Sequence, residues 1–282
     1  MKKYLAIIAA VGLVVILLVG CSGGDKGTKP KVSAQQEYQA LKPDIDTMVA
    51  GVLDYLTTGI NRLRDFESGN PTPPRLLRMA SDADTGMNFN YVYQNGWHIV
   101  SASLELDSIQ IAMAESLRFT DAQGAPQQTP DSTTTSGLHL VTHVAFSSDY
   151  HALNGSLTDY VNFTFSGFQS PTVSVNGAGR FGMDMSGSDT LGAYAVDLGS
   201  TVDMNQVSVS NPYKGGNGCP RAGTADLHLD GSFSGHDDDG TAVSGDVTAS
   251  VAITFQLSGS ADVTVDIANT QFNSSVNACP HH

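Results

Sequence analysis

The stretch VTASVAITFQL, residues 247–257, decides the fold class of this chain. Its apolar residues alternate with small and polar residues along the whole stretch. This two-residue period is typical of a β-strand with one buried face. The turn sequence SGS at 258–260 follows, and the alternation resumes in DVTVDI at 262–267. Together the two segments predict an antiparallel β-hairpin.

The same alternation recurs through the chain from residue 87 onward. Clusters of Gly, Asn, Asp and Ser separate the strand segments and are typical of hairpin turns, so we expect an antiparallel sheet of roughly ten strands. Several strands exceed the usual ~5–6 residues, and long strands curl. We therefore expect a mainly β protein with a curved antiparallel sheet or half-barrel, and leave open whether it closes into a barrel. Further clear segments are 138–146, 161–165, 194–198 and 225–230.

A helix is predicted within residues 33–67, where apolar residues recur at steps of three and four and mark one apolar face. Pro43 suits the first turn of a helix. We expect this helix to pack on the sheet, which makes the fold α+β. Residues 68–86 would connect it to a β domain of residues 87–282. The apolar positions are Ile45, Met48, Val49, Val52, Leu53, Leu56, Ile60 and Leu63.

The first residues carry a targeting pattern. Lys2 and Lys3 precede an apolar run over 4–20, which ends in the sequence LVGC at 18–21. This pattern resembles the type II signal peptide and lipobox of bacterial lipoproteins. The resemblance implies that residues 1–20 are removed and that the thiol of Cys21 receives a diacylglycerol.

The expected lipid would anchor the protein stably in a membrane, because two or three acyl chains suffice for that. Residues 21–32 would form a flexible tether, since 22–31 are rich in Gly, Lys, Ser and Thr. By analogy with enteric lipoproteins, Ser22 favours the outer membrane, on its periplasmic or surface face. The sequence alone decides neither the membrane nor the leaflet.

The chain is strongly acidic, with a formal net charge of −14 over 282 residues. Loss of residues 1–20 would remove two lysines and no acid, giving −16. Such a surface repels phosphates, so nucleic acid is excluded as a partner. Residues 119–282 hold sixteen Asp against Arg180, Lys214 and Arg221 as the only Lys or Arg. These aspartates suit turns and exposed strand faces.

The densest acidic cluster is Asp237, Asp238 and Asp239. We interpret it as a solvated hairpin tip, with weak Ca²⁺ binding as the alternative, because hard oxygen ligands suit that ion. The spacing of an EF-hand loop is missing, and no other cofactor is expected. His139 and His143 share one face of a predicted strand, with His151 nearby, and we interpret all three as surface histidines.

No catalytic residue can be named from the sequence. The sequence GAGRFG at 177–182 matches a dinucleotide-binding pattern, but strand alternation continues after it, so we interpret its glycines as kinks in a hairpin. An H-E-x-x-H motif, a C-x-x-C pair and a Walker A loop are all missing from the sequence.

Four arginines gather near the predicted helix: Arg62, Arg64, Arg75 and Arg78. They could contact anionic lipid headgroups or pair with the acidic β domain. We favour the second interpretation.

Cys219 and Cys279 are expected to form a disulfide. Once Cys21 is lipidated, these two remain, and an exported protein folds in an oxidising compartment. Each is followed by Pro, which places both in loops.

These observations predict a lipid-anchored cell-envelope protein with a non-catalytic binding, carrier or structural role. A helix over a concave sheet resembles the half-barrel carriers of the outer-membrane lipoprotein pathway, in architecture only and without a shared motif. A hydrophobic or other envelope ligand would suit that role, and the protein partners stay open. The alternatives are a surface module that binds glycan or Ca²⁺ and a hydrolase with a scattered active site.

Overall fold

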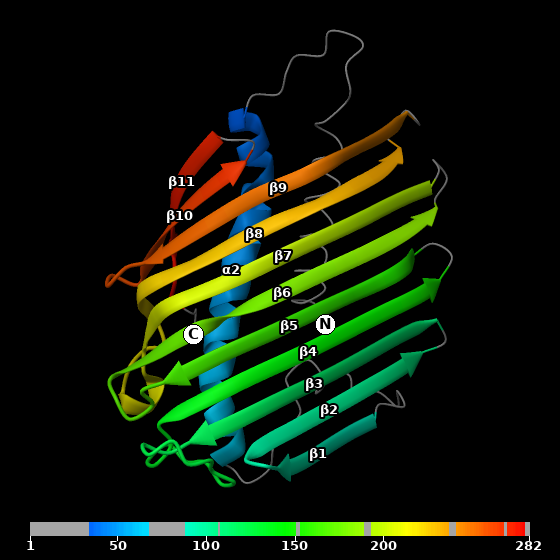
Figure 1. Ribbon diagram of the computed structural model, residues 1–282. Coiled ribbons are helices and arrows are strands. Elements are labelled where there is room, and N and C mark those ends of the chain that lie inside the picture. Colours follow the sequence, from blue (N-terminus) through cyan, green and yellow to red (C-terminus); the bar gives the residue numbers. More distant parts are fainter. Residues whose placement is uncertain are drawn as a thin grey trace.

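A computed structural model describes residues 34–67, 88–106, 108–150, 153–188, 193–236, 241–267 and 270–279. The expected signal peptide, tether and connector lie outside the described residues. The described part is a single sheet with one long helix packed against it (Figure 1).

The sheet contains eleven strands in the order of the sequence, each antiparallel to the next. The hairpin predicted from 247–267 is confirmed: Ile253 lies opposite Val263 and Val251 opposite Val265. The strands are β1 (Asn88–Gln94), β2 (Trp97–Leu106), β3 (Ile109–Thr120), β4 (Gly137–Tyr150), β5 (Leu153–Ser166), β6 (Thr172–Ser188), β7 (Ala193–Ser210), β8 (Pro220–His236), β9 (Ala242–Phe255), β10 (Ser260–Ile267) and β11 (Thr270–Asn277).

The predicted curved, antiparallel sheet is confirmed, and it is open. The order of pairing makes β1 and β11 its two edges. The central strands are long, from 14 residues in β4 to 18 in β7. Strands of this length reach well past a single helix lying across them. The face against the helix therefore has one region under the helix and a second region beyond it.

Helix α2 (Ala34–Glu67) crosses the strands on one face of the sheet (Figure 1). The predicted apolar stripe faces the sheet: Val49, Val52, Leu56, Ile60 and Leu63 are each at most 3% exposed. Gly59 lets the helix approach closely, because a Cβ there would lie 2.0 Å from Cζ of Phe165. A glycine that costs helix propensity is therefore used for packing.

Pro43 is not in the first turn as predicted. Helix α2 begins at Ala34, so Pro43 lies inside it. A proline lacks the amide that would complete the ladder of hydrogen bonds, yet long helices tolerate one when packing elsewhere holds them. No described helix is both long and apolar enough to cross a membrane.

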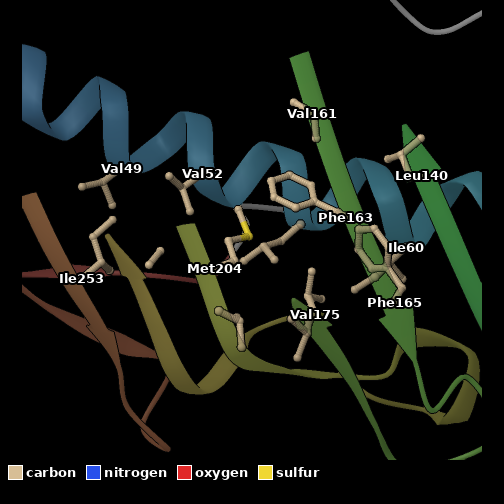
Figure 2. Close-up of a cluster of buried hydrophobic side chains, with 14 of the residues drawn as sticks. Val49, Val52, Ile60, Leu140, Val161, Phe163, Phe165, Val175, Met204 and Ile253 are labelled. Carbon is tan, nitrogen blue, oxygen red and sulfur yellow. The ribbon is translucent and has the colours of Figure 1, made fainter. Parts of the chain in front are cut away.

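The two faces of the sheet differ sharply in chemistry. We call the face against α2 the inner face and the opposite one the outer face. Strand register places an apolar row under the helix, and Figure 2 shows much of it packed against Val49, Val52 and Ile60. The neighbouring row on the outer face is small or polar on most strands and includes Asn162, Asp203 and Asp226. The inner row runs through Leu140, Phe163, Gly177, Met204, Ala225 and Ile253.

Candidate functional site on the inner face

The inner face stays apolar beyond the part that α2 covers. Register places Leu157 opposite Met183, and Met183 opposite Leu198. One row further from the helix, Met185 lies opposite Val196, which lies opposite Phe233. We call these six residues the distal inner face. They come from β5, β6, β7 and β8 and form a continuous apolar surface on four adjacent strands.

Among the described residues, the aromatic contacts of helix α2 lie on the near half of the inner face. The Tyr55 ring packs on Phe163, and the Phe66 ring packs on Tyr91, His98 and Phe119. Figure 1 shows the strands continuing well past the helix on one side. In the full chain Leu198 is only 1% exposed and Met183 4%, whereas Met185 and Val196 are half-buried.

A polar contact marks the boundary between the two halves. The Tyr55 hydroxyl donates to Oδ2 of Asp159 at 2.7 Å. Asp159 lies on the inner face between Val144 and Phe181 of the adjacent strands. Burial raises the pKa of Asp159, while the hydrogen bond from Tyr55 and the charge of His143 act in the opposite direction. This carboxyl group is a polar point at the edge of an apolar surface.

The inner face opens to solvent at the β1–β3 edge of the sheet. Phe89 and Ile109 are 40% and 36% exposed. Phe89 lies in the row of Ala102, and Ile109 lies opposite Ser148, so both belong to the inner face. Exposed large apolar side chains that continue a buried apolar surface are typical of an entrance to a binding region.

The outer face is acidic and holds a shallow groove. Asp184 lies directly opposite Asp197, and Asp203 opposite Asp226. The groove has a volume of about 270 Å³, and its lining includes Asp203, Asp226, His228 and Asp266. Within the described ranges, no group of three or more His, Cys, Asp or Glu residues is arranged to hold a metal ion.

The Ca²⁺ candidates Asp237, Asp238 and Asp239 lie outside the described residues. They fall between β8 and β9, where His236 is paired with Ala242. The strands on either side of these aspartates therefore form the predicted hairpin. The position of the aspartates at its tip stays a prediction.

The histidines of β4 are surface residues. Nε2 of His139 lies 2.8 Å from Oδ1 of Asn162, and its ring packs on Trp97. His143 is exposed on the same outer face, and His151 lies outside the described residues. Among the described histidines, His98 is fully buried, and it lies within hydrogen-bonding distance of Tyr91 Oη and the Gln127 carbonyl. In the described part of the chain, neither His98 nor His139 joins a Ser–His–Asp arrangement.

The sequence GAGRFG lies wholly inside strand β6 and not between a strand and a helix. Gly177 sits where the register between β6 and β7 shifts, and its φ of +142° favours glycine. A Cβ there would lie 2.1 Å from the Asn162 carbonyl oxygen. The interpretation as a strand kink is confirmed for Gly177, whereas Gly179 and Gly182 lie in regular strand pairing.

The arginines near α2 have different partners. Arg62 is buried and forms ion pairs with Glu115 and Asp65. The guanidinium of Arg64 lies 5.9 Å from the centre of the Tyr213 ring. Arg75 and Arg78 lie outside the described residues. The prediction that these arginines pair with the acidic β domain is therefore confirmed for Arg62.

The cysteine prediction agrees with the structure. Cys219 and Cys279 form a disulfide, with their Cα atoms 4.5 Å apart. The bond joins the residue before β8 to the segment after β11.

The sequence analysis missed Tyr55, Asp159, Glu115 and His98. A signal for Asp159 was present: on β5 the inner positions read Leu157, Asp159, Val161, Phe163, so one charge interrupts an apolar row. The partner of that charge could not be foreseen, because Tyr55 is 104 positions away.

Comparisons of the chain with protein-family models, with curated proteins and with solved structures gave no match.

Proposed function

We propose that this chain is a lipid-anchored cell-envelope protein that binds an acyl-chain ligand on the distal inner face. The observation that carries the proposal is the mismatch between an apolar inner face that runs the length of the strands and a helix that lies over only part of it. Anchoring through Cys21 rests on the lipobox resemblance.

An apolar occupant suits this region better than water does. Burying apolar surface is worth roughly 25 cal/mol per Å², so leaving Leu157, Met183 and Leu198 open to solvent would be costly. An apolar ligand would provide this burial in the mature protein.

The shape of the surface favours a long, narrow ligand. The row of Leu157, Met183 and Leu198 extends to Phe146 on β4, which lies opposite Leu157. Adjacent strands lie about 4.8 Å apart, so this row spans about 14 Å over four strands. Asp159 and Tyr55 could hold a polar end of the ligand at the boundary, and Phe89 and Ile109 could line its entrance. An extended acyl chain satisfies these features, whereas a carbohydrate does not.

A fluorescent fatty acid tests this proposal. We expect the purified protein to bind it saturably. The substitution Leu198→Gln should weaken binding at least tenfold, which corresponds to about 1.4 kcal/mol, because it places an unpaired amide in the apolar row. Leu257→Gln makes the same chemical change at a turn position that is 79% exposed, and should alter binding less than twofold.

Leu198→Gln also perturbs a buried position, so the melting temperature of each variant should accompany the titration. If that variant fails to fold, the half-buried Met185→Gln replaces it. The acyl-chain proposal fails if the wild-type protein shows no saturable binding, or if the distal variant and the Leu257→Gln control bind equally well.

A separate experiment tests the anchor. Mass spectrometry of the native protein should show a chain that begins at Cys21 and carries acyl groups. Cys21→Ala should accumulate as a longer, unlipidated precursor, whereas Ser22→Ala should be processed normally. An intact Met1 or an unmodified Cys21 in the native protein would contradict the localisation.

A further inference from the structure

A second recess lies at the opposite end of the strands from the distal inner face. It has a volume of about 430 Å³ and is formed where β6 begins and where the loop between β7 and β8 folds over. Thr172 at this end and Met185 at the other are thirteen positions apart on β6. At about 3.3 Å per residue they are separated by roughly 43 Å. The recess is lined by Thr172, Ser210, Lys214, Gly215, Asn217 and Arg221, among others.

The recess concentrates positive charge in an acidic protein. Residues 119–282 contain sixteen Asp but only three Lys or Arg, and two of those three, Lys214 and Arg221, line this one recess. The Lys214 ammonium group donates to Oε1 of Gln169 at 3.2 Å. Among the described residues, neither Lys214 nor Arg221 forms a salt bridge with a carboxylate. Their charge is therefore available to a ligand.

The loop that carries Lys214 is held rigidly. Asn211 is fully buried, and its side-chain amide donates to the carbonyls of Phe168 and Ser170. Its own carbonyl accepts from the amides of Lys214 and Gly216. Its Oδ1 accepts from the Tyr213 amide, and the Tyr213 hydroxyl donates to the Ile60 carbonyl of helix α2. A site on such a loop is preorganised and loses little entropy when it binds.

Neutral donors complete the lining. Oδ1 of Asn217 accepts from the Cys219 amide, which leaves the Asn217 side-chain NH₂ group as a donor. Thr172 contributes an exposed hydroxyl. The Cys219–Cys279 disulfide fixes the chain two residues before Arg221. Two cations together with amide and hydroxyl donors are the groups that recognise a phosphate.

We propose that this recess binds a phosphate group, either free or as the headgroup of an anionic lipid. The site is separate from the acyl-chain site in position and in chemistry, so the proposal does not depend on the proposed function. It accounts for the convergence of Lys214 and Arg221 in a region that otherwise repels anions.

The test follows backbone amide signals of the purified full protein in a non-ionic detergent at constant ionic strength. Inorganic phosphate is titrated in one arm, and short-chain phosphatidylglycerol, with phosphatidylcholine as its neutral counterpart, in the other. We expect saturable shifts at Gly215 and Gly216. Arg221→Gln and Lys214→Gln should each weaken binding at least tenfold. Arg180→Gln removes one positive charge from the exposed surface of β6 and should change binding less than twofold.

Arg221→Lys should recover part of the binding lost in Arg221→Gln, which separates charge from folding. Binding of inorganic phosphate alone identifies a free phosphate as the ligand, and preferential binding of phosphatidylglycerol identifies a headgroup. The proposal is overturned if no phosphate-bearing probe gives saturable shifts, or if Arg180→Gln weakens binding as much as Arg221→Gln does.

Discussion

Replacing Cys219 and Cys279 together by serine should lower the free energy of unfolding by roughly 4 kcal/mol, because the disulfide closes a loop of 60 residues in the unfolded chain. For a domain of this size, that loss corresponds to a melting temperature about 8–16 °C lower. Chemical denaturation of the oxidised protein and of the double variant measures the difference directly.

The position of the bond adds to this expectation. It ties the end of the edge strand β11 to the start of β8, so it encloses β8, β9, β10 and β11 in one covalent loop. The reduced wild-type protein serves as the control and should match the double variant. Thiol labelling of the denatured, unreduced protein should find neither cysteine free. A double variant within 1 kcal/mol of the oxidised wild type would contradict the prediction.

The strands were predictable from the sequence because each depends on local alternation. Residues 247–267 show this well: the order of apolar and polar residues defined the face of each strand, and the SGS sequence at 258–260 defined the hairpin. The apolar stripe of α2 was predictable for the same reason, because its spacing of three and four residues depends only on nearby positions. The disulfide was predictable by counting cysteines.

The candidate sites were not predictable, because they depend on which distant residues the fold brings together. Asp159 meets Tyr55 across 104 positions, and Thr172 lines one recess with Lys214 and Arg221. Alternation shows that a strand has an apolar face, but it does not show how much of that face a helix covers. The length of the inner face that lies beyond α2 follows from the angle at which the helix crosses the strands (Figure 1).

Replacing Arg62 by methionine should destabilise the protein by about 3–5 kcal/mol, because it leaves Glu115 as an unpaired charge in the core. Arg62 and Glu115 are 2% and 3% exposed. Nε of Arg62 donates to Oε1 of Glu115 at 3.1 Å, and Nη2 bonds to Oε2. Glu115 otherwise lies between Val100 and Thr142 on the adjacent strands. The pair therefore holds helix α2 to β3 through a two-point contact in a desolvated position.

The cost of Arg62→Met should depend on pH. Burial raises the pKa of Glu115 above its ordinary value of 4.5, and Arg62 opposes that rise. Without Arg62 the folded-state pKa rises further, so the folded state retains a proton that the unfolded state releases. Stability then falls as pH increases from 4.5 through the folded-state pKa. The destabilisation should thus be smaller at pH 5 than at pH 8.

A double variant separates the unpaired charge from the lost packing. Arg62→Met combined with Glu115→Leu removes both charges and should restore most of the stability, since a well-packed apolar pair can replace a buried ion pair. Arg64→Met, an exposed arginine two residues further along α2, should change stability by less than about 1 kcal/mol. Urea denaturation of the four proteins at pH 5 and pH 8 provides the comparison. If the double variant is no more stable than Arg62→Met, or if the single variant loses equal stability at both pH values, the buried charge of Glu115 is not the cause of the destabilisation.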